Sequence, residues 1–183
     1  MKQSNVFAKL EKGFRFLSIL QLALILFQGT GVLTYVLTVW PGMKDAPSTG
    51  ITALAVGALA AGFARSFLWI RIYWVGAGAA GTLRACGEST ELPDRLVPTL
   101  KTLTRLLVAS CVLDVLLLPA IFLMDEFFPF TLSSGHLGLI QTAVLLYPQA
   151  FGLAALVLAY LIHQYGRLMK ERCQMKKDIE LTV

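Results

Sequence analysis

Four long apolar stretches, separated by short polar breaks, occupy most of this 183-residue chain. An α-helix of about 20 apolar residues is long enough to cross the hydrocarbon core of a bilayer. Charged residues make up only 15% of the chain, whereas an average globular domain has about 25%. We therefore predict an all-α integral membrane protein in which residues 1–183 form a single membrane domain, a four-transmembrane-helix bundle. The predicted spans are residues 14–40, 51–73, 103–124 and 137–161.

The lysine and arginine residues are distributed unevenly among the breaks. Cytosolic loops of membrane proteins are enriched in these two residue types. Thirteen of the 16 lie in the N-terminal segment, around the break between the second and third spans, or after the fourth span. The opposite side has only Lys44, and Arg65 and Arg71 lie within the second span. We therefore predict that both termini are cytosolic. The same clustering explains the net charge of +5, so no direct binding to nucleic acid is expected.

Two charged residues, Arg65 and Asp114, fall deep inside the predicted spans. A charge near the bilayer centre costs about 2.5–3.5 kcal/mol even on insertion scales, so such residues usually have a partner or a function. Arg65 lies about 21 Å and Asp114 about 15 Å below the outer ends of their helices. We predict that the two side chains face each other or share a polar cavity. Three interpretations stay open: a structural ion pair, a site for a ligand or proton, and a snorkelling arginine beside a protonated aspartate.

Other polar residues interrupt the first and fourth spans. Gln21 and Gln28 are seven residues apart, so they share one face of a helix. Gln141, Tyr147 and Gln149 lie around a proline, which frees a backbone carbonyl about one turn earlier. These five side chains are candidates for lining a cavity. The alternative is hydrogen bonding between neighbouring helices, worth roughly 0.6–2 kcal/mol for each bond.

Small residues recur at the spacing of one helical turn between Gly57 and Gly62 in the second span. Such spacing lets two helix backbones approach closely, either within one chain or in a homodimer. Further along, residues 76–81 contain the string GxGxxG, which is typical of dinucleotide-binding loops. No alternation of strands and helices surrounds this string. We therefore interpret its glycines as part of the cytosolic end of the second helix.

Two segments on the predicted cytosolic side have helical patterns. The first is the loop at residues 86–101, where leucines begin to recur on one face: Leu96, Leu100, Leu103 and Leu107. This pattern predicts a short amphipathic helix that leads into the third span. The second segment, residues 162–180, is predicted to be a tail helix with alternating charge. Both segments are candidates for contact with a cytosolic protein partner.

Motifs for catalysis or metal binding do not occur in the sequence. HExxH, GxSxG and Walker sequences are missing, and His136 and His163 are predicted on opposite sides of the membrane. We therefore predict no catalytic residue, no cofactor and no metal site. An enzyme is the least supported class of function.

The segment Ser89–Glu126 and the final residues Asp178–Val183 resemble an uncharacterised bacterial family. Its members are small four-span membrane proteins that end in an acidic residue followed by Leu-Thr-Val, and they are often encoded beside an Xre-type helix-turn-helix regulator. The family often has Phe and Ser where Thr90–Leu92 stand here. The resemblance implies a multi-pass protein of the bacterial inner membrane, with no catalytic residues to transfer.

These observations favour a non-enzymatic polytopic membrane protein that acts through protein contacts. A signalling, regulator-tethering or immunity component would fit this class. The alternative is a small dimeric transporter or ligand-binding bundle that uses Arg65 and Asp114.

Overall fold

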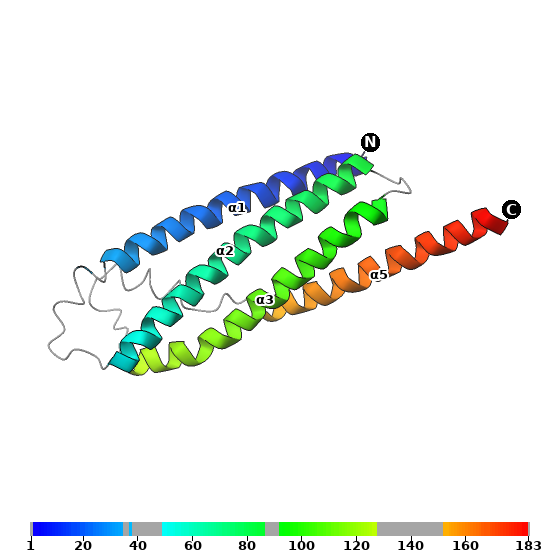
Figure 1. Ribbon diagram of the computed structural model, residues 1–183. Helices are drawn as coiled ribbons and strands as arrows, with labels where there is room; N and C mark the ends of the chain where they lie inside the picture. The colour runs from blue at the N-terminus through cyan, green and yellow to red at the C-terminus, as the bar shows by residue number, and fades with distance from the viewer. Residues whose placement is uncertain (1, 35–36, 38–48, 87–91, 128–151, 183) are drawn as a thin grey trace.

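The computed structural model describes residues 2–34, 37, 49–86, 92–127 and 152–182. These residues form four α-helices and no strand: α1 (Lys2–Thr34), α2 (Thr49–Cys86), α3 (Leu92–Phe127) and α5 (Gly152–Thr182). The all-helical prediction is therefore confirmed for this part of the chain. Helix α1 packs against α2, α2 packs against α3, and α3 packs against α5. Successive helices run in opposite directions along nearly parallel axes (Figure 1).

Within the described residues, one segment is long and apolar enough, by length and composition, to cross a membrane. It is Val6–Leu33 in α1, with a mean hydropathy of 1.9. Much of the fourth predicted span lies outside the described residues, and so do Gln141, Tyr147 and Gln149. Their predicted roles stay predictions.

The helices are longer than the predicted spans. Helix α2 continues past Tyr73 to Cys86, because residues 74–86 contain no proline to stop it. The predicted loop helix and third span form one continuous helix, α3. Pro93 is tolerated because it lies in the first turn, where a backbone N–H has no helical partner. Residues 162–180 likewise continue the preceding helix without a break, as α5.

Two apolar clusters hold α2, α3 and α5 together. The first consists of Trp69, Ile72, Leu107, Ala155 and Ala159. Two alanines of α5 leave room for the larger side chains of α2 and α3, so the three helices pack closely. The second cluster lies nearer the C-terminal end of α2. Its buried members are Ala79 and Leu96, and Leu83, Leu100 and Met169 pack against them.

Glycines of α2 allow α1 to approach closely. A Cβ atom at Gly76 would lie 3.3 Å from the ring of Phe14, and a Cβ at Gly81 would lie 3.8 Å from the carboxylate of Glu11. A Cβ at Gly78 would have nothing within 4 Å among the described residues. Two of the three glycines in the GxGxxG string are therefore packing positions for α1.

We expect Gly76→Leu to lower the free energy of unfolding in detergent by about 1–3 kcal/mol, because the new side chain overlaps the ring of Phe14. Gly78→Leu is the matched control, since it adds the same side chain two residues away in open space. Thermal unfolding followed by circular dichroism measures both variants. Equal losses of stability would contradict this account of the α1–α2 contact.

Contacts between neighbouring helices define where residues of different helices lie along the bundle axis, which we call their height. The contacting pairs are Phe14 with Gly76, Arg65 with Asp114, and Leu100 with Gly166. Neighbouring helices are antiparallel and have the same rise per residue. Counting a number of residues forward along one helix therefore matches counting the same number backward along its neighbour. Residues at the height of Phe14 are therefore Gly76, Leu103 and His163. Because the first predicted span begins at Phe14, we call this height the inner border of the predicted membrane region.

All four helices continue past the inner border on the same side. We call these segments, residues 2–13, 77–86, 92–102 and 164–182, the basic end. It extends about 15–18 Å on α1, α2 and α3, and about 28 Å on α5. Figure 1 shows the resulting projection of α5 beyond the other helices, at the end of the bundle where the N-terminus also lies.

Candidate functional site

The centre of the bundle contains a buried ion pair between α2 and α3. Arg65 Nη1 donates a hydrogen bond to Asp114 Oδ1 over 3.2 Å, and the two side chains are only 1% and 7% exposed. The contact predicted from the depths of these residues is therefore formed. In a medium without water, two such charges attract strongly, and each would be costly to bury alone.

Helical spacing brings these charges together. On α3, Leu107, Ser110, Asp114 and Leu117 are all buried and follow one another at three or four residues, so they form one face. The facing residues of α2, Arg65, Ser66 and Trp69, are also buried.

Several buried polar atoms around the pair have no hydrogen-bond partner among the described residues. They are Gln21 Nε2, Gln28 Oε1, Trp69 Nε1, Ser110 Oγ and Asp114 Oδ2. Burying such atoms costs free energy unless a water molecule, an ion or a ligand satisfies them. The relative heights of the helices place Gln21, Trp69 and Ser110 in one layer, about one turn from the ion pair. We call these three residues, with Arg65 and Asp114, the central polar cluster.

The sequence identified Gln21, Arg65 and Asp114 in this cluster but missed Trp69 and Ser110. Serine and tryptophan are common in apolar helices, so neither stands out by residue type. The signal for Ser110 was its spacing, because it lies one turn before Asp114 on the same face. Gln28 lies about two turns further along α1 than Gln21, and both side chains are buried, which fits their predicted place on one face of the helix.

A groove of 260 Å³ lies between α3 and α5, around the inner border. Its walls combine an apolar floor with basic side chains, and no acidic residue lines it among those the structure describes. The lining residues are Val97, Leu100, Lys101, Thr104, Ile162, His163, Gly166, Arg167 and Lys170. Arg167 also donates to Glu171 over 2.9 Å, one turn further along α5. The groove therefore presents positive charge above an apolar surface.

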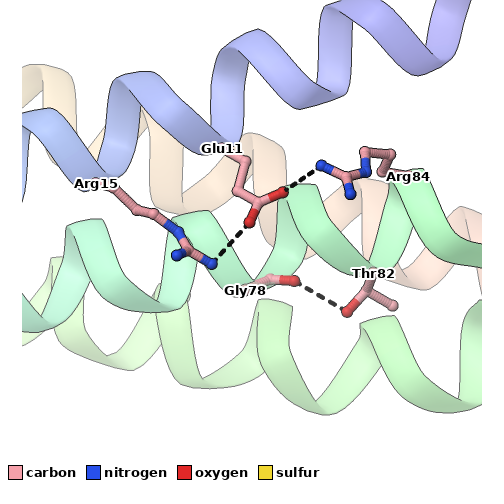
Figure 2. A network of polar contacts seen from close by, with 5 residues as sticks. All are labelled: Glu11, Arg15, Gly78, Thr82 and Arg84. Carbon is pink, nitrogen blue, oxygen red and sulfur yellow. Dashed lines mark hydrogen bonds and ion pairs between the residues drawn. The ribbon is translucent and has the colours of Figure 1, made fainter.

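A second set of charges joins α1 to α2 at the basic end. Glu11 accepts hydrogen bonds from Arg15 over 2.8 Å and from Arg84 over 3.2 Å, as Figure 2 shows. Both arginines are exposed, and such pairs contribute only about 0–1 kcal/mol each. The network links the ends of the two helices.

The described residues contain no group of three or more His, Cys, Asp or Glu side chains that could hold a metal ion. The central polar cluster offers one carboxylate, one guanidinium and neutral donors and acceptors. Such a set can bind a small polar molecule or a proton, or it can fix two helices in register.

No protein-family model, curated protein or solved structure matches this chain. The resemblance to the bacterial four-span family therefore stays a prediction. The two features that bear on function are the central polar cluster and the groove.

Proposed function

We propose that this chain is a non-enzymatic, four-span protein of the bacterial inner membrane. In this proposal its basic end projects into the cytosol and binds a protein partner. The observation that carries the proposal is the groove between α3 and α5. All of its lining residues except Thr104 come from the two segments predicted as partner contacts, the loop before the third span and the tail helix.

The outer surface of the helices supports a location in lipid. Large apolar side chains are exposed outside the basic end on α1, on α5 and on residues 108–116 of α3. Those at least 60% exposed are Phe16, Ile19, Leu26, Leu116, Val157 and Tyr160. A soluble monomer rarely exposes apolar side chains over so continuous a surface, whereas lipid tails solvate them without cost. The charged side chains of Arg65 and Asp114 lie inside the bundle instead, as is typical of charges within membrane-spanning helices.

The charge distribution supports the orientation. The helices run up and down, so the start of α1, the end of α2, the start of α3 and the end of α5 come to the same end of the bundle (Figure 1). The basic end contains eleven of the 16 lysine and arginine residues, and Arg15 and Arg105 lie within three residues of it. Their gathering at one end matches the enrichment of positive residues on the cytosolic side.

The chemistry of the groove selects the kind of partner. Lys101, Arg167 and Lys170 supply positive charge at the rim, and Val97, Leu100 and Ile162 supply apolar contacts. A complementary partner has carboxylates beside apolar side chains, as an acidic amphipathic helix does. We therefore propose that an acidic segment of a cytosolic protein occupies the groove, in a signalling or tethering role.

A photo-crosslinking amino acid at Thr104 tests the identity of the occupant in living cells. We expect a protein adduct, identified by mass spectrometry. With the purified partner, Lys101→Glu combined with Lys170→Glu should weaken binding about 10-fold or more. Arg105→Glu is the control, because Arg105 is exposed on α3 and does not line the groove. Adducts with lipid alone would contradict a protein partner.

A ligand-binding bundle or small transporter is the second candidate function. The observation that favours it is the set of unsatisfied polar atoms in the central polar cluster, including Asp114 Oδ2 and Ser110 Oγ. A bound polar molecule would satisfy them. In this case Asp114→Asn, which keeps a hydrogen-bond acceptor for Arg65, would abolish binding or flux in the fraction of the protein that folds.

A further inference from the structure

Helix α5 has two apolar stripes on different faces. The inner stripe faces α2 and α3, where its residues pack in the two apolar clusters or line the groove. They are Ala155, Ala159, Ile162, Gly166 and Met169. The outer stripe is exposed and longer. Its residues, which we call the α5 seam, are Leu158, Leu161, Tyr165, Leu168, Arg172, Met175 and Ile179.

The spacing of the α5 seam is that of a coiled coil. The seven residues follow one another at alternating intervals of three and four, which are the a and d positions of a heptad. Five of the seam's uncharged members, Leu158, Leu161, Tyr165, Leu168 and Met175, are 49–57% exposed, so none of the described helices covers this face. The inner and outer stripes lie about 100° apart around the helix, so a new partner on the seam leaves the contact with α3 in place.

We infer that the α5 seam pairs with the same seam of a second copy of this chain, as a parallel two-stranded coiled coil that continues beyond the membrane. This inference rests on the four-span topology of the proposed function, and it identifies one partner, a second copy of the chain. Leu158 and Leu161 lie on the lipid side of the inner border, where lipid can solvate them. Leu168 and Met175 lie about 7 Å and 18 Å beyond the border, so they would otherwise be in water.

The length of α5 shows why a partner is needed there. The last part of this helix extends about 10 Å further than α1, α2 and α3, and no described helix accompanies it (Figure 1). A single helix of this length is marginally stable in water, because most helical stability comes from packing of an apolar face. A second α5 would supply that packing.

Symmetry and charge favour a second copy over an unrelated helix. Two copies in one membrane share the same orientation, so a two-fold axis along the membrane normal makes their tails parallel and aligns each seam with itself. The heptad assigns Glu171 to a g position and Lys176 to the e position five residues later. In a parallel pair, these positions meet across the interface with opposite charges.

The coiled coil has to accommodate two charged residues, Glu171 and Arg172. Glu171 is bonded to Arg167 within its own chain, but this exposed pair is weak enough to exchange. Arg172 occupies a central a position, beside the partner copy's g position. A charged residue at an a position lowers the stability of the coiled coil, but it fixes the register and favours two strands over larger assemblies.

Cysteine crosslinking in native membranes tests the inference on the full chain. The background variant replaces Cys86, Cys111 and Cys173 by serine. In it, Met175→Cys places a thiol at a d position, and Gln174→Cys places one on the neighbouring c position as the control. We expect an oxidant to convert the Met175→Cys variant to a covalent dimer and to leave the Gln174→Cys variant largely monomeric.

A further substitution and a labelling experiment complete the design. Adding Leu168→Asp to the Met175→Cys variant should abolish the covalent dimer, because the aspartate interrupts the seam. Equal crosslinking at 174 and 175, or none at either, would overturn the inference. A membrane-impermeant thiol reagent, applied to inside-out vesicles, labels residue 174 only if the tail is cytosolic. A failure of the seam is thereby distinguished from a failure of the proposed topology.

Discussion

Asp114→Ala is expected to destabilise the bundle by about 3–5 kcal/mol, because it leaves the guanidinium of Arg65 buried without its carboxylate. Both side chains are nearly inaccessible, so water cannot replace the lost partner. Unfolding of the purified protein in mixed micelles, titrated with a denaturing detergent, measures the loss. Glu11→Ala is a suitable control, because it removes the carboxylate of two exposed ion pairs and should cost at most about 2 kcal/mol.

The double variant Arg65→Met and Asp114→Leu is expected to recover most of that stability. Replacing both members of a buried ion pair by apolar residues of similar volume is often neutral or stabilising. A double variant as unstable as Asp114→Ala would contradict the assignment of the loss to the arginine whose carboxylate is removed. In that case, other contacts of the two positions would be responsible.

The same double variant separates the two candidate functions. If the ion pair only fixes α2 against α3, the folded double variant keeps its binding to the cytosolic partner through the groove. If the central polar cluster binds a ligand, the variant folds but loses that ligand, because the carboxylate and guanidinium are gone. Partner affinity and ligand flux, measured on one folded protein, therefore give opposite results under the two proposals.

Much of the candidate site could be predicted from the sequence because charge in an apolar helix is conspicuous. Arg65 and Asp114 lie at similar depths once the direction of each span is known, and that direction follows from the lysines and arginines at the helix ends. Their contact over 3.2 Å needed no knowledge of side-chain packing. The shared face of Gln21 and Gln28 likewise follows from helical periodicity alone.

The groove and the extended helices could not be predicted in the same way. Polar residues in the second break suggested a loop with a short helix, yet α3 begins at Leu92 and continues without interruption. A groove depends on which faces of two distant helices meet, and sequence spacing does not specify that. Nor could Gly76 be distinguished from Gly78, because only the position of α1 determines which glycine contacts Phe14.

Every proposal above depends on the proposed four-span topology, and this topology can be tested directly. Only Val6–Leu33 meets the composition criterion for a span among the described residues, so a protein with a single span is the clear alternative. The two arrangements differ most at the second outer loop. Four spans place residue 133 outside the cytosol, whereas a single span through α1 leaves residues 90, 133 and 183 together on one side.

Fusions of paired reporters after Thr90, Ser133 and Val183 provide the most direct measurement. Green fluorescent protein reports a cytosolic position, and alkaline phosphatase reports a periplasmic one. We predict fluorescence after residues 90 and 183, and phosphatase activity after residue 133. Phosphatase activity after residue 183, or fluorescence after residue 133, would contradict a bundle that crosses the membrane four times with its basic end in the cytosol.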